Sequence, residues 1–113
     1  MSEEQAMWAA VKANPADGLP RLVLADWYDE RGRSDLAYAL RWSARRNKYP
    51  RVTPKGYAAV WEPYRRHYHR QDEPHLLPST LHLRLKPNHR AKTVEAAYMA
   101  LAAALGELRR IVE

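Results

Sequence analysis

The sequence predicts a small, mainly α-helical domain of four to six helices. Helix start and stop signals recur at short intervals over residues 1–48, and a helical stripe of apolar residues runs from Val94 to Val112. The chain has 113 residues, of which 46% are hydrophobic, and this suits one domain with one modest core. We expect a single domain over residues 1–113, composed of a helical head (1–48), a basic and aromatic middle (49–92) and a C-terminal helix (93–113).

The first helix is predicted close to the N-terminus. Ser2 followed three residues later by Gln5 is a capping-box pattern. Asn14 should end the helix, because a residue that precedes a proline avoids the α region. The apolar side of this helix is predicted to hold Met7, Trp8 and Val11.

Two further helices are predicted to follow with short connections. Pro20 suits the first turn of the second helix, and Gly32 is a candidate for the residue just past its end. Ser34 should cap the third helix. The inner face of the second helix is predicted to comprise Leu19, Leu22, Val23 and Trp27, and that of the third Leu36, Ala37, Leu40 and Ala44.

The middle of the chain gives weaker signals. Thr53 followed by Pro54 indicates a helix start, and Tyr57, Val60, Trp61 and Tyr64 follow at helical spacing. Pro63 within this run should kink the helix or begin a new one. Residues 80–86 alternate between apolar and polar side chains, which predicts a short strand or hairpin there. A lone strand needs a partner, so a short helix is the alternative for this segment.

The last predicted helix begins after Thr93, its cap. Its apolar residues recur at steps of three and four, as in a heptad, and include Val94, Tyr98, Leu101, Leu105, Leu108 and Val112. We favour an ordinary core helix over a coiled coil, because the stripe is shorter than three or four heptads. The head is then expected to cover the stripe within a monomer, and a dimer through the 94–112 stripe is the alternative.

The charge is distributed unevenly along the chain. The net charge is +6, and it divides into −3 over residues 1–40, +10 over residues 41–92 and −1 over residues 93–113. All five histidines also lie within residues 41–92. Such asymmetry indicates a polyanion or an acidic protein face as a partner, although a solubilising excess of charge would look the same.

The composition also limits the compartment. The chain has no cysteine, which excludes disulfides and thiolate metal sites. No apolar run approaches the roughly 20 residues of a membrane-spanning helix, and the acidic, polar start of the chain is the opposite of a signal peptide. We expect a cytoplasmic protein with no membrane partner.

One segment of the head resembles a known family. Pro20-Arg21-Leu22-Val23-Leu24-Ala25-Asp26-Trp27, the acidic Asp29-Glu30, Arg31-Gly32 and the helix from Leu36 to Arg41 follow an acidic start and an Asn14-Pro15 turn. On this pattern residues 1–48 resemble the bacterial repeat-companion domain, a short module often found beside repeat arrays. The resemblance implies an accessory or interaction module without an assigned activity. No repeat array follows here, which separates this chain from the family's usual setting.

No catalytic or metal site is expected. Asp26, Asp29 and Glu30 lie close together, but nearby arginines should neutralise them in ion pairs. His67 and His69 would diverge on a helix, so with His75 they are only a weak zinc candidate. The sequence has no glycine-rich phosphate loop and no context for a nucleophilic serine. We therefore predict that the protein is not an enzyme and uses no cofactor.

The basic and aromatic block is the strongest functional signal. Arginine side chains fit phosphates, and exposed aromatic rings stack on bases. The chain has no phenylalanine, however, so we favour a core role for its tryptophan and tyrosine rings at helical spacing. The sequence predicts a non-catalytic interaction or adaptor protein, an accessory subunit that binds another protein or complex. The alternative is a nucleic-acid-binding accessory protein that holds DNA or RNA through residues 41–70.

Two sets of residues follow from these arguments. The predicted partner-binding or nucleic-acid-binding residues are Arg41, Arg45, Arg46, Lys48, Arg51, Arg65, Arg66 and Arg70. The predicted core residues are Trp8, Leu22, Val23, Trp27, Leu40, Tyr98, Leu101, Leu105 and Leu108.

Overall fold

Four helices and a two-stranded antiparallel hairpin make up residues 2–61 and 89–112, the residues that the computed structural model describes. They are α1 (Glu3–Ala13), α2 (Leu19–Glu30), α3 (Ser34–Arg46), β1 (Tyr49–Val52), β2 (Ala58–Trp61) and α4 (Val94–Val112). This confirms the predicted mainly helical fold. The strand or hairpin predicted at 80–86 lies outside the described residues.

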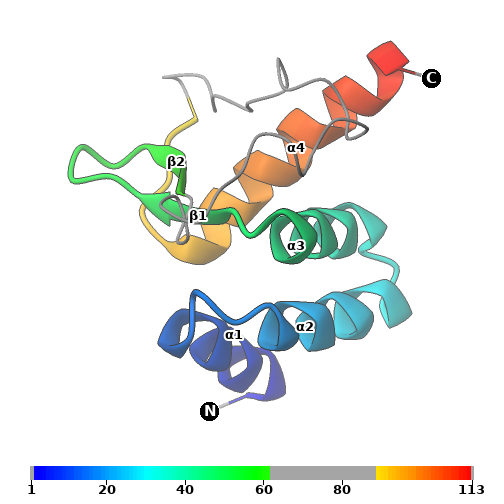
Figure 1. Ribbon diagram of the computed structural model, residues 1–113, viewed down its shortest axis with the longest axis vertical. Coiled ribbons are helices and arrows are strands. Elements are labelled where there is room, and N and C mark those ends of the chain that lie inside the picture. The colour runs from blue at the N-terminus through cyan, green and yellow to red at the C-terminus, as the bar shows by residue number, and fades with distance from the viewer. Residues whose placement is uncertain (1, 62–88, 113) are drawn as a thin grey trace, which may run out of the picture.

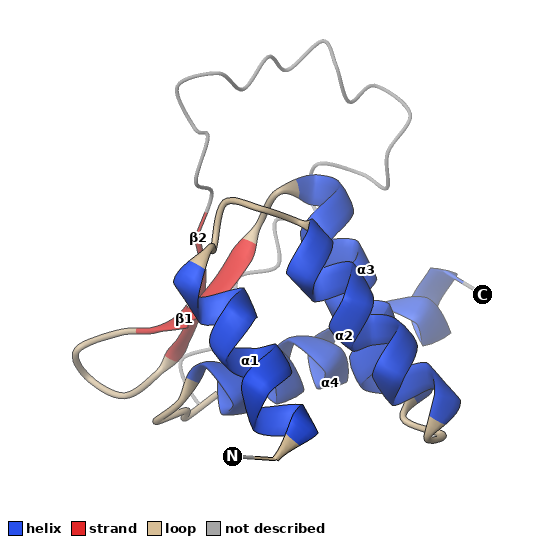
Figure 2. Cartoon of the chain, turned by 90° about the horizontal axis from the view of Figure 1, so that it is seen from below, coloured by secondary structure: helices blue, strands red, loops and turns tan. Residues whose placement is uncertain are grey.

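The elements are stacked in layers. Figure 1 shows α1 and α2 together at the bottom, α3 above them, and α4 crossing the top beside the hairpin. The view from below in Figure 2 shows α1 and α2 in front of α4, with the hairpin extending from one side of the helices. The layers meet in a single main core, to which α1, α2, α3, β1 and α4 all contribute.

The ends of α1 form as the sequence predicts. The Ser2 hydroxyl accepts a hydrogen bond from the Gln5 amide at 3.1 Å, and the Gln5 side chain accepts one from the Ser2 amide at 2.9 Å. This is the predicted capping box. Asn14 is the C-cap, and Trp8 and Val11 are buried, so the helix presents the expected face to the core.

Helices α2 and α3 form an antiparallel pair joined by a tight turn. Pro20 lies in the first turn of α2, and Gly32 takes a left-handed conformation with φ of 79° just beyond its end, both as predicted. The predicted cap of α3 is wrong by one residue. Arg33 precedes the helix without a side-chain cap, and Ser34 is the first helical residue.

The predicted inner face of α2 is wrong. The buried residues of this helix are Arg21, Leu24, Ala25 and Tyr28, whereas Leu19, Leu22 and Val23 are exposed. At 100° per residue, the buried set lies on nearly the opposite side of the helix. Leu22 and Val23 are therefore not core residues.

Distant partners explain why polar side chains occupy the inner face of α2. The Arg21 guanidinium is fully buried, and its Nη1 donates to the hydroxyl and carbonyl of Ser43, at 2.8 and 3.0 Å. The Ser43 hydroxyl also bonds to the hydroxyl of Tyr98 at 2.9 Å. This polar network links α2, α3 and α4, so the helix turns its arginine inward where acceptors are in place for its Nη1.

Residues 53–57 form the turn of the hairpin and not the start of a helix, which corrects the prediction for this segment. The Thr53 amide donates to the Tyr57 carbonyl at 2.8 Å, and the Thr53 hydroxyl accepts from the Tyr57 amide at 3.1 Å. Gly56 has a φ of 81°, which a helix does not allow. Strand pairing then sets Tyr49 opposite Trp61 and Val52 opposite Ala58.

Helix α4 closes the core from above. The Thr93 hydroxyl accepts from the Ala96 amide at 3.1 Å, which confirms the predicted cap. Tyr98, Leu101 and Leu105 are buried against the rest of the core, as is Leu40 of α3, so these four core predictions are confirmed. The described part of the stripe is thus covered within the chain.

Tryptophan and tyrosine supply the aromatic bulk of the core. The ring of Tyr98 lies 5.4 Å from that of Trp8 and 6.0 Å from that of Tyr49, centroid to centroid. Trp42 is also buried. The side chain of Leu108 lies outside the described residues.

Candidate functional site

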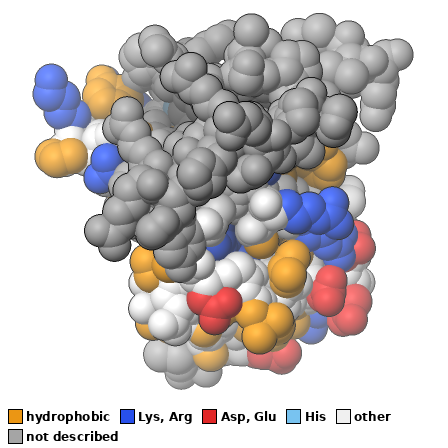
Figure 3. Space-filling model, viewed as in Figure 1, with side chains coloured by type: hydrophobic (Ala, Val, Ile, Leu, Met, Phe, Trp, Pro, Cys, Tyr) orange, Lys and Arg blue, Asp and Glu red, His pale blue; other side chains and the backbone are white. Residues whose placement is uncertain are grey.

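The outward side of α2 exposes three large aliphatic residues in one group. Leu19 is 64% exposed, Val23 50% and Leu22 37%. Their spacing of three and four residues places them on one side of the helix, next to Asp26 and Glu30. We call these five residues the α2 outer face. In Figure 3, hydrophobic side chains gather in the lower part of the molecule with acidic side chains around them.

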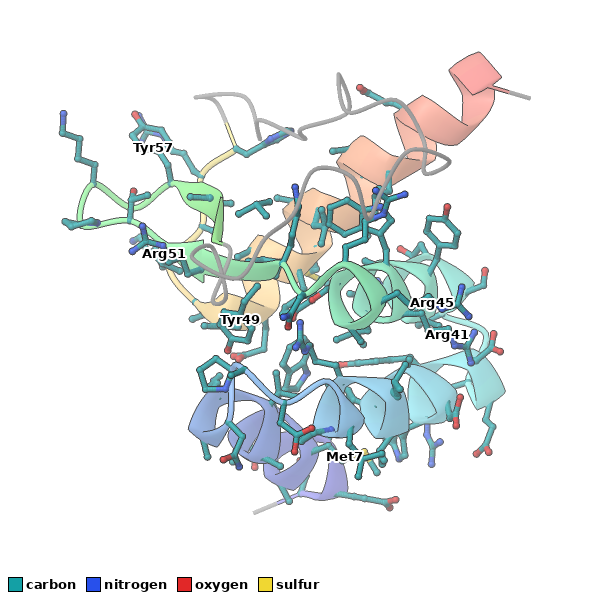
Figure 4. The ribbon with its side chains drawn as sticks, viewed as in Figure 1. Met7, Arg41, Arg45, Tyr49, Arg51 and Tyr57 are labelled. Carbon is teal, nitrogen blue, oxygen red and sulfur yellow. The ribbon has the colours of Figure 1, made fainter. Side chains whose placement is uncertain are left out.

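An arginine from α3 fixes the acidic end of this surface. Arg41 donates to Asp26 at 2.8 Å and to Asp29 at 3.3 Å, and these bonds raise the pKa of Arg41. The carboxylates thus take part in an interhelix ion pair, as predicted, although their partner is Arg41 and not one of the arginines next to them in the sequence. Arg41, whose side chain is 32% exposed, is thus engaged within the chain, and its role as a partner-binding residue stays a prediction. Figure 4 shows Arg41 and Arg45 together on one side of α3.

Trp27 lies at the edge of the α2 outer face and is only partly buried, so its prediction as a core residue is also corrected. Its indole Nε1 donates to the Glu3 carboxylate at 3.1 Å. The Arg31 guanidinium lies 3.7 Å from the ring centroid, in a cation–π contact. Trp27 therefore ties α2 to the start of α1 and keeps one side close to solvent.

A shallow cleft of about 640 Å³ lies between α1 and α4. The Trp8 indole donates to the Tyr28 hydroxyl at 2.9 Å, and that hydroxyl donates in turn to the Glu4 carboxylate. Burial, together with the hydrogen bond to Glu4, raises the pKa of Tyr28 to about 12. A tyrosine kept protonated in this way is not a base at neutral pH. The cleft is lined by Glu4, Gln5, Trp8, Ala9, Lys12, Tyr28, Glu95 and Met99.

The predicted basic residues have different roles in the structure. Lys48 is buried, with 7% of its surface exposed, so it is not available to a partner. Arg46 lies over the Trp42 ring at 5.5 Å. Arg45 and Arg51 are exposed but belong to different elements, α3 and β1, which Figure 4 shows well apart. The predicted residues Arg65, Arg66 and Arg70 lie outside the described residues.

Three exposed cations were missed by the sequence reasoning. Lys55 lies in the hairpin turn, and Arg90 and Lys92 lie just before α4. The segments 48–61 and 89–93 contain no aspartate or glutamate. This local absence of acidic residues could have indicated from the sequence that these cations have no nearby carboxylate.

The described residues hold no group of three or more histidine or acidic side chains that could bind a metal ion. The weak zinc candidates His67, His69 and His75 lie outside them. Among the described helices, none is both long and apolar enough to cross a membrane.

Comparison of the chain with protein-family models, with curated proteins and with solved structures found no match. The resemblance of residues 1–48 to the repeat-companion domain therefore remains a prediction from the residues that support it.

Proposed function

We propose that this protein is a non-catalytic interaction module that binds a helical segment of another protein through the α2 outer face. The observation that supports this proposal is the exposure of Leu19, Leu22 and Val23 on a helix whose opposite side is fully buried. Exposed aliphatic side chains gathered on one helix face are typical of a protein-binding surface.

The fold holds the α2 outer face in place from behind. Leu24 and Ala25 are fully buried, and the Arg21 network fastens the helix to α3. The exposed aliphatic residues are therefore presented on a fixed surface, which lowers the entropic cost of binding. Their spacing forms a ridge of the kind that packs into the groove of a second helix.

The charge around this surface indicates the chemistry of the partner. Residues 1–40 carry a net charge of −3, and Glu30 adjoins the aliphatic residues beside Asp26, whose carboxylate is paired with Arg41. An amphipathic helix with apolar residues on one side and lysine or arginine beside them complements this surface. A role as an accessory subunit of a larger assembly agrees with the resemblance of the head to an interaction module.

A photo-crosslinking residue at position 23 would identify the partner in cells. The purified partner would then be titrated against Val23→Glu, and we expect affinity to fall at least about tenfold, because a buried, unpaired carboxylate is costly. Met99→Glu is the matched control, since Met99 on α4 is also 50% exposed. Equal loss in both variants, or no loss in Val23→Glu, would contradict the proposal.

A further inference from the structure

The hairpin and the segment just before α4 carry four exposed cations and no aspartate or glutamate in their described residues. Arg51, Lys55, Arg90 and Lys92 are all exposed. Within residues 2–61 and 89–112, none of them forms a salt bridge with a carboxylate. Figure 1 shows the hairpin projecting from the side of the helices, at a distance from α2.

Strand register brings two of these cations and one aromatic ring onto the same side of the hairpin. Arg51 pairs with Ala59, and directly paired residues of an antiparallel ladder share a face. Tyr57, two residues before Ala59, lies on that face too, because side chains alternate along a strand. Tyr57 in turn bridges to Arg90, and the Arg90 guanidinium lies 5.8 Å from the centre of the tyrosine ring.

The opposite face of the hairpin is used by the fold. Ala58 is buried in a small second cluster with Ala91 and Ala97, and Val52 packs against the same cluster. This packing attaches the hairpin to the start of α4. It leaves Arg51, Tyr57 and Arg90 on the side that can meet a ligand, whereas Tyr49, at the other end of that side, is buried against Tyr98. We call the surface formed by Arg51, Tyr57 and Arg90 the hairpin face.

We propose that the hairpin face binds single-stranded nucleic acid without sequence preference. An aromatic ring between two arginines on a sheet face lets a base stack while the cations contact flanking phosphates. Lys55 in the turn and Lys92 just before α4 are further exposed cations close to this face in the chain. In a duplex the faces of the bases are already stacked on one another, so the Tyr57 ring would contribute less to binding. An acidic protein surface would use the cations alone.

This inference goes beyond the proposed protein-binding function and rests on separate residues. The α2 outer face is apolar and acidic, whereas the hairpin face is basic and aromatic. Each surface can therefore be removed without altering the other.

The test is fluorescence anisotropy with a labelled mixed-sequence strand of about 15 nucleotides, single or double, at about 100 mM salt. We expect a dissociation constant of about 1–100 μM for the single strand. Arg51→Gln/Lys55→Gln/Arg90→Gln should weaken binding at least about tenfold. The log–log salt slope should become shallower by about 2, since each lost phosphate contact of a single strand contributes about 0.7.

Substitutions of Tyr57 test the contribution of base stacking to affinity separately from that of charge. Tyr57→Phe keeps the ring and should bind as the parent does, while Tyr57→Leu should bind about fivefold or more weakly. The charge control is Arg31→Gln/Arg33→Gln/Arg45→Gln, which loses the same net charge from α3 and the α2–α3 turn, and should change binding less than about threefold. Thermal melts establish that every variant is folded.

Four results would overturn the proposal. The first is no binding of the single strand at about 100 μM, and the second is an equal loss of binding in the charge control. The third is that Tyr57→Leu binds as tightly as the parent. The fourth is that poly-glutamate binds as tightly as the single strand and its binding is weakened equally by the triple substitution. The last result would assign the hairpin face to an acidic protein partner instead.

Discussion

The orientation of α2 can be tested with one substitution made at two positions. Leu24 is fully buried, whereas Leu19 on the same helix is 64% exposed. Leu24→Ala removes packing between the helices and leaves a cavity, so it should lower the free energy of unfolding by about 2–5 kcal/mol. That is a large part of the roughly 5–15 kcal/mol that stabilises a typical domain.

Leu19→Ala should have a much smaller effect. Burying a whole leucine side chain is worth about 1.5–3 kcal/mol, and only about a third of Leu19 is buried, so the expected loss is below about 1 kcal/mol. No cavity forms at the surface, and alanine is a good helix former.

Urea unfolding, followed by far-UV circular dichroism and by tryptophan fluorescence, measures both losses. Coincident transitions and an unchanged m-value would confirm that the free energies can be compared. If Leu19→Ala cost as much as Leu24→Ala, the aliphatic side of α2 would be the core side. The α2 outer face would then not exist as a binding surface.

Three further results are expected. Arg21→Met should leave the free energy of unfolding unchanged or raise it by up to about 2 kcal/mol, because no described residue accepts a hydrogen bond from Nε or Nη2 of Arg21. A loss above about 3 kcal/mol in urea unfolding would contradict this. Tyr98→Phe should cost about 0.5–1.5 kcal/mol in the same assay, through the lost hydrogen bond to Ser43. Tyr28, with a pKa raised from 10.0 to about 12, should stabilise the fold below pH 10 and lose that contribution as pH rises through 12. Absorbance titration of tyrosinate should show this ionisation at high pH, and at a lower pH in the Glu4→Gln variant. An unchanged titration in that variant would contradict the role of Glu4.

Local signals predicted the ends of the helices well. The capping box of Ser2 and Gln5, the left-handed Gly32 and the Thr93 cap all form as expected. Each depends on residues a few positions apart, so the sequence holds the whole interaction. The α4 stripe was equally readable, because a helix with so regular an apolar side buries that side in most folds.

The hairpin was misread for a physical reason. Thr53 before Pro54 suits a helix start and also suits a turn, because the threonine hydroxyl can accept from an amide in either. The choice is made by Gly56 with its positive φ and by packing of Ala58 against Ala91, far along the chain. The exposed cations of the hairpin face could be counted in the sequence, but only strand pairing sets Arg51 and Arg90 beside Tyr57.

The sequence by itself determined the helical class, the helix ends and the inward side of α4, since these follow from contacts within one turn or one helix. Only the tertiary structure decided which way α2 faces and which cations remain exposed. A buried arginine is stable only where distant acceptors are in place, and for Arg21 those are on Ser43 and Lys48. These acceptors come from α3 and the residues after it, so the sequence of α2 alone does not contain them. Periodicity within α2 therefore predicted that its aliphatic side is buried, whereas in the fold that side faces solvent.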